Sequence, residues 1–582
     1  MNLTPQLLSS GICLLQFEIK HSIVAKDHIT LSWVLANKPT WLFGLKRVRN
    51  NYKNKDGQRL TFNFKGIDKT AKTTDIPNGM QSSLLDYHLN QGNLKAKDTE
   101  QAKHCAVIKV TTGSGNELSH LAHLLSPMFD FDTLSAIEPQ LLNNIAKSLK
   151  WSVDERIRQG HDLCKGIIFT ELGCTLEPLK DEDVQYAKLA KFWKLQFANG
   201  SSLQEKEVLR YKAIKPMTRQ RLVPVIVGVD NDTAENREKM ARAVASIKLI
   251  SPESIQKTTN TVVIKDAFDL AARLAGKQVS DSIFLIALTK GADKIKLRDE
   301  AFAKSVATQF MLLDHPQKFY TNKYSGNYYN NVAAGLFSKG GGQLCEIQNL
   351  PGDVDLFVGL DMGGVNLRFP GVSFLFTASG AQLGWQIADS QLGEKLTKDS
   401  LTNLLYKCVR SYATAHDGQR PRHIVLHRDG KFYEDIEQII AFEQEHNLKI
   451  SVVEILKSGA PVLFNRTFDA QGKKQFANPQ FGDYALLEKN EAILATYSGS
   501  ELGSMGNSVS IRPLRIRIVH GDSKIEHILT QVIALSRIHG ASLYRHPRLP
   551  VTTHHADRFA TLRQEVDVDA LSRMDRLCPV YL

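Results

Sequence analysis

Residues 356 to 361, Leu356-Phe357-Val358-Gly359-Leu360-Asp361, predict a strand that ends in a carboxylate. A second strand of this kind is predicted at Ile424-Val425-Leu426-His427-Arg428-Asp429. Between them the pattern predicts a hairpin that turns at Ser379-Gly380, followed by an amphipathic helix with apolar residues from Leu401 to Val409. In a sheet built from a hairpin and a crossover the two Asp-ended strands should be neighbours, so that both carboxylates share one end of the sheet. The alternative is that each Asp is only a turn residue at a strand end.

A second α/β region precedes these strands. Residues 223–229 and 282–288 are continuous apolar runs, and a helix is predicted between them from about Thr233 to Ile247. The order strand, helix, strand predicts a parallel sheet covered on both faces, with ligand sites at the carboxyl ends of its strands. The sequence therefore predicts a separate α/β domain at residues 218–350.

The first 217 residues have a different pattern. Short alternating runs, such as residues 29–34 and 60–64, predict a strand-rich domain over residues 1–116. Residues 117–215 are expected to be more helical, because Leu118, Leu121, Leu124 and Leu125 follow a helical spacing.

Length and composition fit a folded protein with several domains. The chain has 582 residues, more than a single hydrophobic core usually supports, and 42% of them are hydrophobic and 23% charged. There are 73 Lys and Arg against 61 Asp and Glu, a net charge of +12. This surplus favours a polyanionic partner, above all nucleic acid, although a generally basic solvated surface would give the same count.

The spacing of the cysteines and the sequence of the N-terminus bear on the cellular location of the protein. The seven cysteines lie far apart and form no CxxC pair with the His spacing of a zinc site. The N-terminus lacks a basic segment followed by an apolar run, and no stretch approaches the roughly 20 apolar residues that span a bilayer. We therefore expect a reduced, cytoplasmic protein with no membrane partner.

The Asp-ended strands resemble the catalytic strands of the Argonaute family. Two-metal cleavage of a phosphodiester needs several carboxylates from different elements, because Mg²⁺ takes oxygen ligands. Residues 357–361 resemble the first catalytic strand of a PIWI domain, and residues 426–431, Leu-His-Arg-Asp-Gly-Lys, are similar to the family's Arg-Asp-Gly strand end. Glu394 stands between them where the family places a mobile glutamate that completes the site.

A fourth ligand is expected late in the chain, on a helix that follows a Pro-containing turn. Residues 548–558 resemble that segment, and the register assigns the ligand position to Asp557. In a register shifted by two or three residues, His554 or His555 would be the ligand instead. With Asp557 the resemblance implies an active Asp-Glu-Asp-Asp tetrad that binds Mg²⁺ or Mn²⁺, with the metal held by the three aspartates Asp361, Asp429 and Asp557.

The resemblance also implies a pocket for the 5′ end of a guide strand. Lys294 and Arg298 are four residues apart, hence on one face of a helical turn, where backbone N–H groups and two cations could meet a phosphate. Gln309 and Lys339 resemble other pocket residues, and the terminal carboxylate of Leu582 is expected to help bind a metal there. Many relatives place a Tyr and a Lys at the positions of Lys294 and Arg298, the Tyr stacking on the first guide base, and in this sequence no aromatic residue occupies that place. A solvated helix face is the alternative for Lys294 and Arg298.

The implied architecture is an α/β multidomain protein. It consists of a strand-rich N-terminal domain (1–116), a linker or reduced PAZ-like region (117–217), a Rossmann-like MID domain (218–350) and an RNase H-like PIWI domain (351–582). Only some 217 residues precede the MID-like region, too few for a full set of N, PAZ and linker domains. We therefore expect the PAZ domain to be reduced or absent.

Three functions are compatible with this sequence. The first is an endonuclease that uses a short 5′-phosphorylated guide to cleave complementary DNA or RNA, in defence against plasmids or phage. The second is a guide-binding protein that locates invading nucleic acid and recruits a separate effector helicase or nuclease. The third is an unrelated RNase H-fold enzyme such as a transposase or resolvase, which the MID-like region disfavours.

Overall fold

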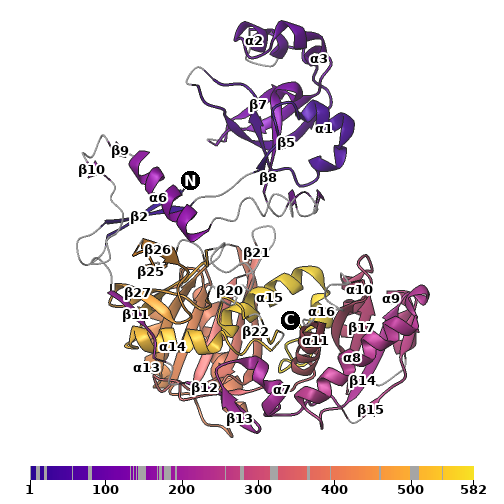
Figure 1. Cartoon of the computed structure of the whole chain (residues 1–582), viewed down its shortest axis with the longest axis vertical. Coiled ribbons are helices and arrows are strands. Elements are labelled where there is room, and N and C mark those ends of the chain that lie inside the picture. The colour runs from indigo at the N-terminus through magenta and orange to yellow at the C-terminus, as the bar shows by residue number, and fades with distance from the viewer. Residues whose placement is uncertain are drawn as a thin grey trace. The chain divides into compact units, whose positions relative to one another are not determined.

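The computed structural model describes most of the chain. The described residues are 2–7, 13–18, 23–54, 57–76, 81–113, 115–130, 133–134, 137–138, 141, 152–166, 168–169, 174–175, 185–190, 193–255, 257–275, 279, 281–314, 325–362, 368–392, 395–457, 460–468, 470–472, 474–498, 510–540, 542–544 and 546–581. They form two compact units, one of residues 1–4 and 15–151 and one of residues 5–14 and 152–582 (Figure 1).

The first unit contains a six-stranded antiparallel sheet. Its strands follow the order β3 (Ile23–Val24), β8 (Leu125–Phe129), β4 (Arg47–Asn50), β5 (Thr61–Asp68), β6 (Val107–Thr111) and β7 (Glu117–Leu121). Helix α1 (Leu31–Asn37) packs on this sheet, with Leu31 and Val34 in its core. The predicted strand-rich character of this part of the chain is confirmed.

Two local predictions in this unit were wrong. Residues 29–34 were expected to form a strand, but Thr30 caps α1 by accepting a hydrogen bond from the Trp33 amide, and Leu31 and Val34 bury one helical face. Residues 117–125 were expected to be helical, but they form β7, a short 3-10 turn and the start of β8. Leu118 is exposed there while Leu121 is buried, so the four leucines do not share one face.

The second unit contains the predicted parallel sheet. Its strands follow the order β15 (Lys257–Thr258), β14 (Arg221–Val227), β17 (Ser282–Leu288) and β18 (Ala307–Leu312), and β16 (Val262–Ile264) also pairs with β14. All of these pairs are parallel. One face packs against α8 (Ala234–Ile250) and α11 (Ser325–Lys339), the other against α9 (Ala267–Leu274) and α10 (Lys294–Phe302). Because both faces are covered, β17 is buried along its whole length.

A nine-stranded mixed sheet forms the rest of the core of this unit. Its order is β11 (Gln185–Lys188), β27 (Asp483–Glu488), β28 (Glu491–Leu494), β29 (Leu514–His520), β24 (Lys449–Leu456), β23 (His423–Asp429), β20 (Leu356–Met362), β21 (Arg368–Thr377) and β22 (Gln382–Leu392). The predicted hairpin is β21–β22, and β20 and β23 are parallel neighbours. The predicted sheet around the Asp-ended strands is therefore confirmed.

Alternation along β20 determines what each face of the nine-stranded sheet contacts. Leu356, Val358 and Leu360 pack in the cluster that contains α12 (Lys398–Ala415) and α13 (Ile436–His446). Phe357 packs in the other cluster, with α14 (Ile525–Leu535) and α15 (Val551–Glu565). Since side chains alternate between faces, Asp361 should lie on the same face as Phe357, the face that α15 covers (Figure 1).

Helix α15 approaches the sheet closely because residue 359 is glycine. A Cβ at Gly359 would lie 2.3 Å from the backbone oxygen of Thr552 in the first turn of α15. Next to this contact, Nδ1 of the buried His427 on β23 is hydrogen-bonded to Oγ1 of Thr552 at 2.9 Å. These two contacts fix the start of α15 over β20 and β23.

Candidate metal centre and basic pocket

Three of the predicted carboxylates converge at one end of the nine-stranded sheet. In the register of β20 and β23, Leu360 is opposite Arg428, so Asp361 and Asp429 are the next pair. Asp557 comes from α15, which covers that face. One carboxylate oxygen from each of the three aspartates lies within 4.8 Å of the others. Glu394 lies outside the described residues, so its expected place in the tetrad stays a prediction.

Among the described residues, neither His554 nor His555 belongs to this group of three carboxylates. His555 is buried, and its Nδ1 is hydrogen-bonded to the Tyr581 hydroxyl at 2.9 Å. The ring of His554 lies against that of His539, with 4.5 Å between the ring centroids. Burial lowers the pKa of His554 to about 4. Asp557, rather than either histidine, is thus the α15 residue that lies with Asp361 and Asp429, and its assignment as a metal ligand stays a prediction.

Two of the three acids, Asp361 and Asp429, lie in an environment that disfavours their charge. Burial raises the pKa of Asp361. Burial, and then the charge of Asp361, raise the pKa of Asp429 to about 6. A cation that could satisfy these oxygens would therefore be bound favourably. Carboxylate oxygens at such spacing are the donor set that Mg²⁺ or Mn²⁺ prefers, so the residues present fit a divalent ion.

Two cations contact this cluster, and no local sequence pattern indicates either role. Nη1 of the buried Arg428 lies 3.9 Å from Oδ1 of Asp361. Nζ of Lys457 lies 2.8 Å from Oδ2 of Asp429 and 2.9 Å from Oδ1 of Asp557. Burial acts to lower the pKa of Lys457, but the two carboxylates outweigh it and the pKa is raised, so the side chain is an ammonium.

Basic side chains gather around Gln309, a residue in the middle of β18, and we call this group the basic pocket. Lys339, the last residue of α11, is only 3% exposed, and its Nζ donates a hydrogen bond to Oε1 of Gln309 at 2.9 Å. Burial, and then the charges of Arg298, Lys294 and Arg558, hold the pKa of Lys339 well below 10.5. Four of the predicted pocket residues are thus brought together. Leu582 lies outside the described residues.

Arg558 is a member of this pocket that the sequence reasoning missed. It follows Asp557 on α15, and successive residues of a helix point about 100° apart, so one helix serves both the carboxylate cluster and the basic pocket. Its position next to an expected metal ligand is the signal that could have found it.

Two details of α10 differ from the expectation for a phosphate at its start. The Lys296 amide already donates to Oδ1 of Asp293, the N-cap, at 3.0 Å, so this amide has a carboxylate partner. The Phe310 ring, from β18, has Lys294 Nζ 5.1 Å and Arg298 Cζ 5.4 Å from its centroid. An aromatic ring thus lies beside these cations, although the sequence around them contains none.

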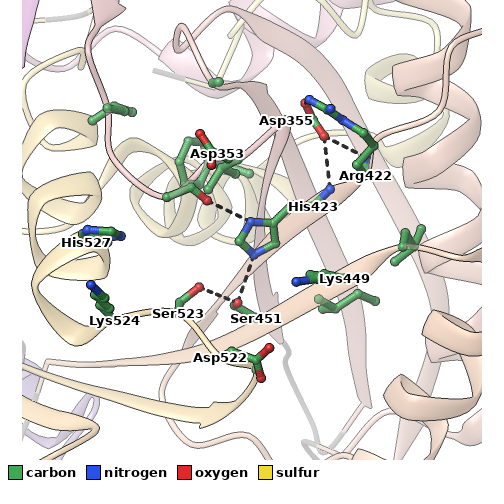
Figure 2. Close-up of a pocket in the computed structure, with 18 of the residues that line it drawn as sticks. Asp353, Asp355, Arg422, His423, Lys449, Ser451, Asp522, Ser523, Lys524 and His527 are labelled. Carbon is green, nitrogen blue, oxygen red and sulfur yellow. Dashed lines mark hydrogen bonds and ion pairs between the residues drawn. The ribbon is translucent and has the colours of Figure 1, made fainter.

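A cavity of about 1620 Å³ opens at the amino ends of β20, β23 and β24, opposite the carboxylate cluster (Figure 2). His423 projects into it, with Nδ1 bonded to the Gly352 carbonyl and Nε2 to the Ser451 hydroxyl, each at 3.1 Å. Lys449, at the start of β24, lies at its edge. None of the described residues predicted for the site lines this pocket.

Comparison with known proteins identifies the family. The family model for the Piwi domain matches residues 283–567, and the model for the Argonaute PAZ domain matches residues 32–127. The chain belongs to the Argonaute family. The PAZ match lies within the antiparallel unit, whereas the expected position of a linker or reduced PAZ-like region was 117–217, with the PAZ domain reduced or absent. The two segments overlap only over residues 117–127.

Relatives of this Argonaute extend along nearly its whole length. It is 22% identical to a protein argonaute of Synechococcus elongatus over 91% of this chain and 73% of that protein. It is 24% identical to a protein argonaute of Thermus thermophilus over 97% of this chain and 76% of that protein.

Solved structures share the fold. Clostridium butyricum Argonaute bound to a guide DNA and a 19-mer target DNA has a TM-score of 0.70 and 18% identity, over 95% of this chain and 75% of that one. Marinitoga piezophila Argonaute in complex with a 5′ OH guide RNA has a TM-score of 0.63 and 13% identity, over 100% and 79%. In the part of this Argonaute that the structure describes, no helix is long and apolar enough to cross a membrane.

Proposed function

We propose that this Argonaute binds a short 5′-phosphorylated guide and cleaves the complementary DNA or RNA strand by metal-dependent hydrolysis. The observation that carries the proposal is the convergence of Asp361, Asp429 and Asp557 within 4.8 Å at one sheet end. The solved relatives with guide DNA, target DNA or guide RNA support the nucleic acid partners.

The residues of the two candidate sites would have different roles. Lys339, Arg298, Lys294 and Arg558 gather positive charge around Gln309, and this charge would hold the guide's terminal phosphate. Asp361, Asp429 and Asp557 would hold Mg²⁺ or Mn²⁺, completed by Glu394. When bound, such ions activate water and stabilise the leaving oxygen. Because α15 carries both Asp557 and Arg558, one helix would position a residue of the guide-end site and a residue of the carboxylate cluster.

A cleavage assay tests the proposal. The full chain is loaded with a 5′-phosphorylated guide, given a matched labelled target and Mn²⁺, and compared with Asp429→Asn. Asp417→Asn is the control, because Asp417 is exposed and has a φ of 52°, a conformation that Asn tolerates. We expect product with the wild-type chain and the control and none with Asp429→Asn.

The outcome separates the two Argonaute functions. Tight guide binding without product would contradict the nuclease and favour the guide-binding protein that recruits a separate effector. Equal cleavage by Asp429→Asn would refute the assignment of the carboxylates. Sequencing of the nucleic acids that co-purify with the chain would show whether guides are RNA or DNA, and enrichment of plasmid or phage sequences would support a role in defence.

A further inference from the structure

Lys457 forms ion pairs with two of the three carboxylates of the cluster. It follows β24, which runs parallel to β23, so it emerges at the sheet end that carries Asp429. Its single ammonium bridges Asp429, from a strand, and Asp557, from a helix, at 2.8 and 2.9 Å. The same two residues belong to the group that could hold a metal ion.

The two cations of the site differ in their freedom to move. Arg428 has a side chain that is 3% exposed, lies 3.7 Å from Glu434 and donates to the backbone oxygen of Asp429. The Lys457 side chain is 36% exposed. Its backbone is anchored, because Nη2 of Arg548 donates to the Lys457 oxygen at 2.8 Å, while its flexible side chain can turn toward solvent. Of these two cations, Lys457 is therefore the one whose side chain can move away from the carboxylates.

A divalent ion and the Lys457 ammonium cannot occupy this place together. An ion held by Asp429 and Asp557 would take the same two oxygens that are now 2.8 and 2.9 Å from Nζ. The two positive charges would then be only a few ångströms apart in a half-buried site, where they repel each other strongly. Loading of the ion must displace the lysine.

We propose that Lys457 is the resident counter-ion of the metal-free site and competes with the divalent cation for Asp429 and Asp557. The inference rests on the proposed function in so far as it takes the cluster as the metal site. Lys457 neutralises the carboxylates until an ion arrives, and it sets the metal concentration at which the site loads. It is a positioning residue, which acts through the carboxylates.

Mn²⁺ binding to the full chain, without nucleic acid, tests this inference. Bound and free Mn²⁺ are separated by electron paramagnetic resonance for the wild type, Lys457→Met and Lys457→Arg. Met keeps the length and the unbranched stem but removes the charge, and we expect about tenfold to a hundredfold tighter Mn²⁺ binding. Lys457→Arg keeps the charge and should bind Mn²⁺ no more tightly than the wild type.

Lys449→Met is the matched control, because Lys449 lies at the other end of the same strand, beside the second pocket (Figure 2). It should leave Mn²⁺ affinity unchanged. Lys457→Gln is a second neutral variant in case the Met variant does not fold, which circular dichroism would show, and it should also bind more tightly. Equal or weaker Mn²⁺ binding by the folded neutral variants would overturn the competition.

The failure of this inference differs from the failure of the proposed function. If Asp429→Asn abolishes Mn²⁺ binding while Lys457→Met leaves it unchanged, the metal site stands and the competition is refuted. If neither the wild type nor the neutral Lys457 variants bind Mn²⁺, both the competition and the metal site are refuted. Unchanged Mn²⁺ affinity with impaired cleavage would refute competition and assign Lys457 to contact with nucleic acid.

Discussion

Replacement of Lys339 by Met should remove most of the preference of this Argonaute for a guide with a 5′-phosphate. Lys339 is the most buried basic residue of the basic pocket, and its amino group donates a hydrogen bond of 2.9 Å to Gln309. Met has nearly the same length and shape, so the substitution removes mainly the amino group that would face the phosphate as an ammonium.

The size of the effect follows from Coulomb's law. One charge of a phosphate about 4 Å from the ammonium gains about 4 kcal/mol at an effective dielectric constant of 20. Part of this gain is used to protonate the amine, since its pKa in the free protein is well below 10.5. We therefore expect affinity for a 5′-phosphorylated guide to fall on the order of a hundredfold, and affinity for a 5′-hydroxyl guide to fall less than about tenfold.

The same argument predicts a pH dependence with a definite sign. The phosphate raises the pKa of Lys339 in the complex above its lowered value in the free protein, so binding takes up a proton between those two values. Affinity for the phosphorylated guide should fall as pH rises through this window, by up to about tenfold per pH unit. The phosphate itself has a pKa near 6 and is fully charged above pH 7.5, so it does not cause such a fall.

Isothermal titration calorimetry in two buffers of different ionisation enthalpy measures this proton uptake. The wild-type chain should take up as much as one proton per phosphorylated guide, and Lys339→Met should take up none. Lys296→Met is the control, because Lys296 is an exposed lysine of α10. Wild-type affinity and proton uptake in Lys339→Met would refute the reasoning.

Three further predictions concern stability. Burial raises the pKa of Glu205 from 4.5 to about 8, so its contribution to stability is fully present below pH 4.5 and is lost as pH rises through 8. The loss amounts to about 4 kcal/mol in the free energy of unfolding, and Glu205→Gln should remove it. If the unfolding free energies of both proteins, measured with urea, changed in parallel between pH 5 and 9, this prediction would be contradicted. Asp429→Asn should stabilise the metal-free protein by roughly 2 to 4 kcal/mol at pH 8, because the raised pKa of Asp429, about 6, means that its charged form destabilises the folded state. A melting temperature of Asp429→Asn below that of the wild type would be evidence against this prediction. Gly359→Ala should destabilise the protein by about 3 kcal/mol or more, because the added Cβ clashes with the backbone of Thr552. Gly326→Ala is the control, since a Cβ there meets no atom within 4 Å and should not destabilise the protein. Equal melting temperatures of the two variants would show that α15 can move away from β20.

The buried strands could be predicted because parallel strands covered on both faces are apolar along their whole length. Residues 282–288 and 356–361 coincide closely with β17 and β20 for this reason. The convergence of Asp361 and Asp429 could also be predicted, since parallel neighbours bring their carboxyl ends to one edge. Asp557 required the family resemblance, because α15 lies far along the chain and no local pattern shows where it packs.

Other features depend on tertiary structure. The run at residues 29–34 alternates like a strand, but six residues also fit a helix whose buried positions are Leu31 and Val34. Lys457 is an ordinary lysine after a strand, and only the pairing of β24 with β23 brings it to Asp429. Phe310 joins Lys294 and Arg298 across two elements. Such contacts are made between segments, so the sequence of neither segment displays them.

The packing of α15 links the two candidate sites. Asp557 and Arg558 are successive residues of this helix, and its first turn is fixed at Thr552 by the close approach to Gly359 and by the bond to His427. A shift of the helix would therefore move a carboxylate of the cluster and a cation of the basic pocket together. Gly359→Ala should consequently weaken Mn²⁺ binding and guide binding in the same variant, whereas Lys339→Met should affect the guide alone. If Gly359→Ala impaired only one of the two, the sites would not share α15 as their support.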